Sequence, residues 1–221
     1  MNGKDFSGWK CGLPFYGPVL VAGVLLNLTG SPLLTWVGGF VTLLGIAMAL
    51  FFRDFPREIT AGPNDVVSPA DGTITAIEDF ESDPHYDGPC RRVSIFLSVF
   101  SAHINRAPFE STVVKVIPTV GRYLDARDPE CSKHNVSNAL WLDTPRGPMT
   151  VRQITGAVAR RIVCPVTPGA RLGKGEKFGM IRFGSRTELY LPPGTEVTVK
   201  IGEYVYAGLT TMARFQEGPT A

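Results

Sequence analysis

Residues 179–192 read GMIRFGSRTELYLP, and this segment decides how the second half of the chain is interpreted. Apolar and polar residues alternate through 180–183 and again through 189–191, which is typical of two half-buried strands. The pair Gly184-Ser185 separates the two stretches, although neither residue brings the kind of side chain that a strand usually packs. A plain hairpin turn would explain the pair, because Gly and Ser are common in turns.

The same pair also permits a chemical explanation. Gly184 has no Cβ, so the carbonyl before Ser185 is unhindered and its backbone tolerates unusual dihedral angles. The Ser185 hydroxyl could attack that carbonyl and convert the amide into an ester, provided that a base activates it. Position in the sequence alone does not decide between the turn and the reactive bond.

From about Gly62 onward, short apolar stretches alternate with Gly, Pro and Asp. We expect strands over 73–80, 92–99, 112–119, 139–142, 149–154, 158–164, 178–183, 188–191 and 196–201. Many short strands at close spacing predict a mostly β domain, built as a multi-stranded sandwich or barrel. The polar segment 125–138 is the longest candidate loop, and loops of that length often serve a site.

The N-terminal part carries two nearly uncharged apolar runs, 13–28 and 33–52. Twenty helical residues span about 30 Å, one hydrocarbon thickness, and the short break between the runs favours a helical hairpin. Lysines precede the pair and arginines follow it, which predicts a cell-membrane anchor over 1–58 with the domain 59–221 on the cytoplasmic face. A cleaved signal peptide and a hairpin buried in a soluble core are the alternatives.

Composition argues against two other classes of protein. The formal net charge is only +2 and no run of Lys and Arg occurs, so nucleic acid is not an expected partner. The four cysteines are far apart and the three histidines form no cluster, so no protein-bound metal is indicated. We expect the cysteines to be reduced, structural thiols.

Two motifs upstream carry candidate site residues. The stretch SPADG, 68–72, holds Asp71 in a turn at the start of a strand. The stretch FLSVFSAHINRAP ends an apolar strand and delivers His103 and then Arg106. His103 is suited to acid–base chemistry near neutral pH, and Arg106 to binding a carboxylate or phosphate. Each also has a structural interpretation: Asp71 as a turn residue, and His103 as a polar residue at a strand edge.

Taken together, SPADG, the strand-end histidine and the late Gly-Ser downstream of a hairpin resemble the phosphatidylserine decarboxylases. The nearest likeness is to the short form of that family, which is shared with the archaetidylserine decarboxylases. The stretches FFRDFPRE, ARRIVC and GEKFGMIRFGSRTELYLP are similar to it as well. The resemblance runs from about Phe51 to Ile201, and FGMIRFGSR in this context is its most specific part.

This resemblance implies a proenzyme that cleaves itself between Gly184 and Ser185 into chains 1–184 and 185–221. Ser185 would become a covalent pyruvoyl group, which decarboxylates phosphatidylserine to phosphatidylethanolamine and CO2 through a Schiff base. The pyruvoyl carbonyl would serve as the electron sink that the reaction needs. The membrane and an anionic phospholipid are then the expected partners, and a homodimer is what the family suggests.

The resemblance also implies roles for the upstream residues. Asp71 would support the base during cleavage, and His103 would be the acid that protonates the carbanion. The long form has two histidines three residues apart, whereas here the second position is Arg106. Either His103 serves both steps, or Arg106 changes how the cleavage is activated. Arg106 and His134, the latter in the polar loop, are the expected substrate-binding residues.

Three alternatives stay open. One is a decarboxylase for archaetidylserine, because nothing in the sequence distinguishes an ester from an ether lipid. Another is a lipoyl- or biotinyl-like binding module, since VTPGARLGKGEKFGMI resembles the turns of such domains and contains Lys174 and Lys177. The third is an unprocessed family member with a scaffold role, against which the presence of Asp71, His103 and Ser185 argues.

Overall fold

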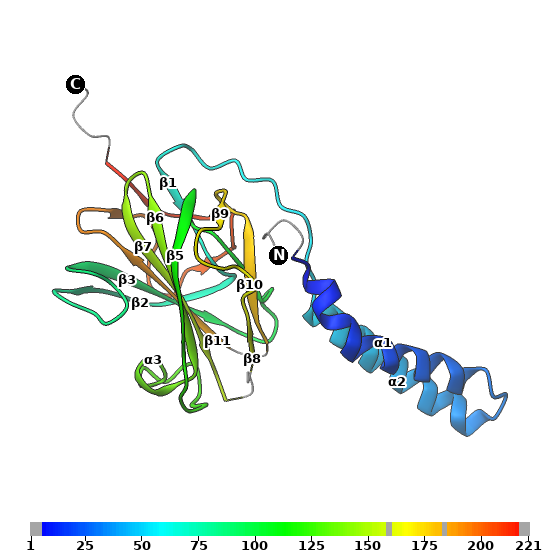
Figure 1. Cartoon of the computed structure of the whole chain (residues 1–221). Helices are drawn as coiled ribbons and strands as arrows, with labels where there is room; N and C mark the ends of the chain where they lie inside the picture. Colours follow the sequence, from blue (N-terminus) through cyan, green and yellow to red (C-terminus); the bar gives the residue numbers. More distant parts are fainter. Residues whose placement is uncertain (1–5, 158–160, 183–184, 217–221) are drawn as a thin grey trace. The chain divides into compact units, whose positions relative to one another are not determined.

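The computed structural model describes residues 6–157, 161–182 and 185–216 (Figure 1). The chain divides into two compact units, which are described separately. One comprises Ser7–Phe55, and the other comprises Met1–Phe6 and Pro56–Ala221.

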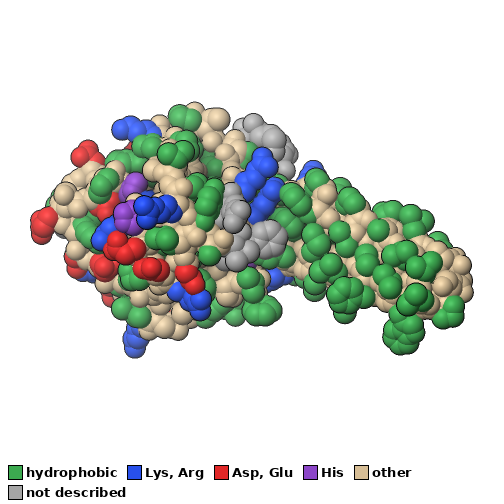
Figure 2. Space-filling view, turned by 90° about the horizontal axis from the view of Figure 1, so that it is seen from below, with side chains coloured by type: hydrophobic (Ala, Val, Ile, Leu, Met, Phe, Trp, Pro, Cys, Tyr) green, Lys and Arg blue, Asp and Glu red, His purple; other side chains and the backbone are tan. Residues whose placement is uncertain are grey.

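The first unit is a pair of helices, α1 (Gly8–Asn27) and α2 (Pro32–Phe51). Each has 20 residues and is long and apolar enough to cross a membrane. Their surface is covered with hydrophobic side chains and is almost free of charge (Figure 2). The predicted hairpin is confirmed, although α1 begins earlier than the apolar run 13–28 and continues through Pro14 and Pro18.

Glycines allow the two helices to pack closely. A Cβ on Gly23 would lie 2.7 Å from the backbone nitrogen of Thr42, and one on Gly38 would lie 2.9 Å from the Gly23 oxygen. Neither position therefore has room for a side chain. Small residues at a helix interface are what membrane helices use, because they let the two backbones approach.

The second unit is built of antiparallel strands and one short helix. Its elements are β1 (Asp65–Val67), β2 (Gly72–Phe80), β3 (Cys90–Leu97), β4 (Ile104–Arg106), β5 (Ser111–Thr119), α3 (Cys131–His134), β6 (Ser137–Thr144), β7 (Gly147–Thr155), β8 (Arg161–Val163), β9 (Arg171–Leu172), β10 (Lys177–Arg182), β11 (Ser185–Leu191), β12 (Glu196–Val197), β13 (Tyr204–Val205) and β14 (Thr211–Arg214). The expected mostly β domain is confirmed.

The largest sheet has eight strands in the order β13-β2-β3-β11-β7-β6-β5-β9, and it curls into a half-barrel (Figure 1). Two three-stranded sheets, β4-β10-β8 and β1-β14-β12, complete the domain. The main core includes Val93 and Ile95 from β3, Leu189 from β11 and Phe178 from β10. Burying one such side chain stabilises the fold by about 1.5–3 kcal/mol.

Strand β11 is central, because it pairs with β3 on one side and with β7 on the other. All seven of its residues are buried, so the expectation that 188–191 is half-buried was wrong. Its second face is covered by α3, whose Ser132 bonds Glu188, and by the turn that carries His85. A buried charge is costly unless it is paired, and these contacts supply the partners.

Two further expectations need correction. The segment 125–138 is not one loop, because it contains α3 and the first residues of β6. The expected strand 158–164 is observed only as β8 (Arg161–Val163), and 158–160 lie outside the described residues. Likewise β10 ends at Arg182, and 183 lies outside them.

Candidate active site

The chain changes sheets at the Gly-Ser pair. Strand β10 ends at Arg182 in one three-stranded sheet, and β11 begins at Ser185 in the eight-stranded sheet. Gly184, and with it the expected scissile bond, lies outside the described residues. Ser185 is fully buried, and its Oγ has no hydrogen-bond partner among the residues that the structure describes. A buried hydroxyl left without a partner is rare and calls for an explanation.

The SPADG stretch meets the end of β3. A Cβ on Gly72 would lie 2.2 Å from the Phe96 oxygen, so only glycine allows this approach. The Asp71 carboxylate, just before β2, is buried and accepts two bonds from Arg57, at 2.6 and 2.7 Å. The Ala207 N–H donates a third, at 2.7 Å. A carboxylate has about four acceptor positions, so one remains for a further donor.

Strand register places Asp71 and Ser185 at the same end of the large sheet. Thr73 of β2 lies opposite Phe96 of β3, and the next residue, Leu97, lies opposite Ser185 of β11. Adjacent strands are about 4.8 Å apart, so residues two strands apart are separated by roughly 10 Å. The segment between Leu97 and β4 carries His103 back to this end.

His103 is fully buried immediately before β4, and its oxygen accepts a bond from the Ile181 N–H at 3.2 Å. Two residues on, Asn105 donates from Nδ2 to the Thr187 hydroxyl at 3.1 Å. Extended backbone alternates its side chains, so His103 shares a side with Asn105, and Ser185 shares a face of β11 with Thr187. The Asn105–Thr187 bond therefore ties the segment that follows His103 to the face of β11 that carries Ser185.

A row of buried amides supports this arrangement. Gln153 of β7 donates from Nε2 to the Asn105 oxygen at 2.8 Å, and Asn138 of β6 donates to the Gln153 oxygen at 3.1 Å. Asn105 also donates to the Pro69 oxygen at 3.3 Å, which ties β4 to SPADG. These amides were not predicted from the sequence. No local pattern marks them, because the partner of each amide lies on a different strand.

The two expected substrate-binding residues lie in different environments. Arg106 is buried, its N–H bonds the Pro69 oxygen, and its guanidinium donates to the Gly175 oxygen at 2.9 Å. It therefore fastens the 173–176 turn beside SPADG. The His134 side chain is 50% exposed on α3 and lies 3.4 Å from the Glu130 carboxylate. Asp71 and Ser185 thus lie at the same end of the large sheet, His103 is tied to β10 and precedes the Asn105 contact with β11, and His134 lies on α3.

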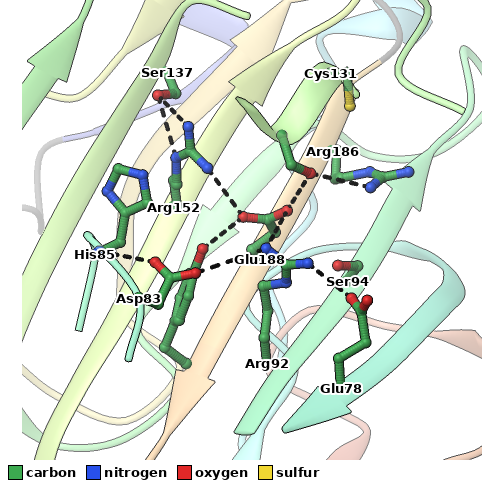
Figure 3. Close-up of polar contacts among 12 residues, drawn as sticks. Glu78, Asp83, His85, Arg92, Ser94, Cys131, Ser137, Arg152, Arg186 and Glu188 are labelled. Carbon is green, nitrogen blue, oxygen red and sulfur yellow. Dashed lines mark hydrogen bonds and ion pairs between the residues drawn. The ribbon is translucent and has the colours of Figure 1, made fainter. Parts of the chain in front are cut away.

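The other face of β11 carries a buried polar network around Glu188 (Figure 3). One Glu188 oxygen accepts from the Ser132 hydroxyl at 2.5 Å. The other accepts from the Tyr190 hydroxyl at 2.9 Å and from Arg152 at 3.4 Å. Arg152 also donates to the Ser137 hydroxyl. Burial, and then the Glu188 charge, raise the pKa of Tyr190 well above its usual value, so its hydroxyl stays a donor.

This network holds the first residues of β11 in place. Arg186, next to Ser185, donates to the Ala126 oxygen and to the Ser132 hydroxyl, both at 3.2 Å. A cavity of about 660 Å³ lies beside the network, and charged residues of both signs line it, including Arg92 and Asp83. Ser185 itself belongs to the opposite face of the strand, so we assign this network a positioning role.

Other kinds of site find less support. Within the described ranges no group of three or more His, Cys, Asp or Glu could hold a metal ion. The four cysteines are free thiols. Lys174, one of the two lysines considered for a carrier module, donates to the Gly62 oxygen at 2.6 Å and lies over the Phe109 ring. Lys177 lies within β10 and not at a hairpin tip.

Comparison with known proteins agrees with this geometry. Residues 44–213 match the family model described as phosphatidylserine decarboxylase. The chain is 41% identical over 190 residues to a phosphatidylserine decarboxylase proenzyme of Magnetococcus marinus, covering 84% of this chain and 87% of the relative. It is 42% identical over 203 residues to one of Aromatoleum aromaticum, covering 91% and 93%. A Nitrosomonas europaea proenzyme is 40% identical over 205 residues, covering 92% and 93%.

Proposed function

The chain belongs to the phosphatidylserine decarboxylase family of carboxy-lyases, and we propose that it is made as a precursor that cleaves itself between Gly184 and Ser185. The larger product would be 1–184 and the smaller 185–221. Family membership favours this enzyme function over the carrier-module and scaffold alternatives. The observation that supports the cleavage site most directly is the buried Ser185 hydroxyl, which has no hydrogen-bond partner among the described residues and lies on the face of β11 that Asn105 contacts.

Cleavage begins with the Ser185 oxygen. Its hydroxyl attacks the Gly184 carbonyl, the Gly184–Ser185 amide becomes an ester, and a proton reaches the departing nitrogen. Loss of the Ser185 α-proton then breaks the ester and leaves Gly184 as a new C-terminal carboxylate. Addition of water to the remaining dehydroalanine and loss of ammonia give the pyruvoyl group. A buried serine with no competing hydrogen bond is suited to this attack, because nothing in the described surroundings must be displaced.

His103 is the proposed base for the first step. An imidazole has a reference pKa of about 6.5, so it can accept a proton near neutral pH. The polar row of Asn105 and Gln153 holds β4 against β7 and β11, and in this proposal it keeps the His103 imidazole within reach of Ser185. Arg106, at the position of the second histidine in the long form, is engaged by the Gly175 oxygen. His103 therefore serves both cleavage and turnover in this proposal.

Asp71 is proposed to support His103 through its remaining acceptor position. Arg57 and the Ala207 N–H hold the carboxylate rigidly, which fixes the direction in which it can accept a further bond. Arg57 thereby becomes a positioning residue that acts through Asp71. An orienting carboxylate of this kind stabilises the protonated imidazole that forms when the base takes a proton.

In the mature enzyme the pyruvoyl group at position 185 would supply an electron sink for decarboxylation. The residues of the chain bind the substrate, keep water out and move protons. Ser185 and His103 are both fully buried, so the reaction would occur away from bulk water. Once CO2 has left, the substrate Cα needs a proton, and His103 is the group placed to donate it.

The apolar hairpin fits a lipid substrate. Helices of 20 residues, packed through glycines, are proposed to anchor the enzyme in the cell membrane, so that phosphatidylserine reaches the site from the bilayer surface. The basic residues flanking the hairpin place the catalytic domain on the cytoplasmic face in this proposal. The homodimer implied by the family resemblance stays a prediction.

Denaturing electrophoresis of the purified full chain tests the proposal, with lipid turnover measured on the same sample. The wild-type chain should give two bands and release CO2 from phosphatidylserine. Ser185→Ala should give one full-length band and no turnover. If Ser185→Ala still yields both fragments, the serine is not the nucleophile.

A further inference from the structure

The turn that follows β3 presents two apolar side chains to solvent. Val99 is 50% exposed and Phe100 is 85% exposed. Both also line a groove of about 360 Å³, together with Phe96 of β3 and Ala126. Isolated apolar side chains are common on protein surfaces, whereas a group of them marks a surface that contacts another molecule.

Strand β13 adds two tyrosines to this group. Tyr204 and Tyr206 are exposed, and their ring centroids lie 5.1 Å apart. The Tyr204 hydroxyl lies 3.2 Å from the Ser101 hydroxyl, so β13 contacts the turn after β3. The strand register agrees, because Tyr204 lies opposite Thr73 of β2 and Thr73 lies opposite Phe96 of β3. Directly opposite residues share a face of the sheet.

These side chains form an apolar rim at the end of the large sheet that holds the candidate site. The rim consists of Val99, Phe100, Tyr204 and Tyr206. Its turn comes shortly after Leu97, which pairs with Ser185. Tyr206 directly precedes Ala207, whose N–H donates to the Asp71 carboxylate. Both segments of the rim are therefore continuous with backbone that contacts site residues.

The composition of the rim and its place in the chain favour a lipid surface as its partner. Tyrosine combines an apolar ring with a polar hydroxyl, and such side chains are enriched where a membrane meets water. Only residues 52–56 separate the end of α2 from Arg57, whose guanidinium bonds Asp71. A short stretch of chain thus joins the proposed anchor to this end of the domain. The proposed substrate is a lipid whose headgroup must reach the same end.

We propose that the apolar rim is a membrane contact of the catalytic domain itself, in addition to the helical hairpin. The rim enters the headgroup region of the bilayer and brings the candidate site to the lipid headgroup. Phe100, the most exposed of the four side chains, inserts into the bilayer, and the tyrosine hydroxyls stay at the level of the headgroups. The purpose of this contact rests on the proposed function, whereas the contact itself can be measured without turnover.

Photo-crosslinking tests the contact directly. The full chain, carrying Ser185→Ala so that it remains one chain, is placed in vesicles of phosphatidylcholine and phosphatidylserine. The photoreactive analogue benzoylphenylalanine replaces residue 100, or residue 120 as a matched control. Val120 is 94% exposed and follows β5, which three strands separate from β3 in the sheet. Irradiation should give several-fold more lipid adduct from position 100 than from position 120, measured by mass spectrometry.

A kinetic comparison tests what the contact does. Full burial of a Phe side chain corresponds to about 10- to 100-fold in an equilibrium constant, and a side chain at an interface is buried in part. Phe100→Ser should therefore raise the KM for phosphatidylserine in vesicles by about 3- to 10-fold. Turnover of a soluble, short-chain phosphatidylserine should stay unchanged, because that substrate reaches the site without a bilayer. Phe100→Trp and the control Val120→Ser should both behave as the wild type.

Each outcome decides for or against the rim. Equal lipid labelling at positions 100 and 120 overturns the proposal, and so does an unchanged KM in vesicles for Phe100→Ser. Crosslinks from position 100 to a second protein chain would show that another copy covers the rim, and would also overturn it. Equal losses of Phe100→Ser on both substrates would assign the residue to the site and not to the membrane.

Failure of the proposed function gives a different result. In that case the wild-type chain neither cleaves itself nor turns over either substrate. Preferential lipid adducts from position 100 would still support the membrane contact, because crosslinking needs no catalysis.

Discussion

Replacing Glu188 by Gln removes one negative charge from the buried network while keeping the shape of the side chain. Glu188 is fully buried, and Arg152, also buried, lies 3.4 Å from its carboxylate. An amide can still accept from Ser132 and bond the Tyr190 hydroxyl, so the hydrogen bonds are largely conserved. Arg92 keeps a second carboxylate, Glu78, at 2.8 Å. The change therefore acts mainly on Arg152.

Its expected size follows from leaving a buried cation without its counter-ion. Removing one partner of a buried ion pair costs about 3–5 kcal/mol. For a protein of this size 1 kcal/mol corresponds to about 2–4 °C in Tm, so Glu188→Gln should lower the Tm by roughly 6–20 °C. Adding Arg152→Met removes the unpaired guanidinium charge, so the double variant should recover much of the lost stability. The single change Arg152→Met should lower the stability by a comparable amount, because it leaves the buried Glu188 carboxylate without its counter-ion.

The assay is thermal unfolding of the full chain in detergent, followed by circular dichroism of the strands. All variants carry Ser185→Ala, so that each remains one chain and cleavage does not alter the unfolding transition. A loss below about 1 kcal/mol for Glu188→Gln would refute the reasoning, because it would be typical of a solvated surface pair and not of a buried one. Strictly additive effects of the two changes would refute it as well, since a coupled pair must deviate from additivity.

Three other predictions follow from the same geometry. His103→Ala should slow precursor cleavage by about 10²–10⁴-fold, the usual contribution of general acid–base catalysis. A time course of cleavage on gels measures this rate, and cleavage at the wild-type rate would exclude His103 as the base. Burial, and then the Arg152 charge, lower the pKa of His85 below its usual 6.5, so the unfolded chain binds a proton more readily than the folded one. Stability should therefore fall as pH drops below about 6.5, and Tm values at pH 7.5 and 5.5 should differ less in His85→Asn; an unchanged difference contradicts this. Gly38→Leu should loosen the helical hairpin by about 1–3 kcal/mol through overpacking, seen as faster limited proteolysis in detergent. Gly39→Leu, where a Cβ meets nothing within 4 Å, is the matched control and should behave as wild type.

The longer strands of the domain were predictable from the sequence because Gly, Pro and Asp separate short apolar stretches. The expected ranges 73–80 and 112–119 coincide closely with β2 and β5. Strands of two to four residues, such as β4 and β13, have too few positions for a period to show. Their existence depends on pairing with distant segments, which local pattern does not report.

Strand β11 shows a second limit of pattern reading. Alternation of apolar and polar residues predicts one face in water, and the stretch 189–191 was therefore expected to be half-buried. In the fold Ser132, Tyr190 and Arg152 cover it. A buried, paired charge and a solvated charge give the same pattern in a sequence, because only their tertiary partners distinguish them.

The candidate site was predictable where a residue type was unusual for its place. Ser185 after a glycine between two strands, and His103 at a strand end, were both identifiable in this way. Arg57 was not, because its bond with Asp71 joins segments that only the fold brings together.

The central claim is that Ser185 becomes the prosthetic group by cleaving its own preceding bond. Intact mass spectrometry of the small fragment from purified wild-type protein tests it most directly. The account predicts a fragment spanning 185–221 that is lighter by one ammonia than simple hydrolysis would give, and that is blocked to Edman sequencing. A fragment that begins with an unmodified serine, or a chain that remains whole, would contradict it.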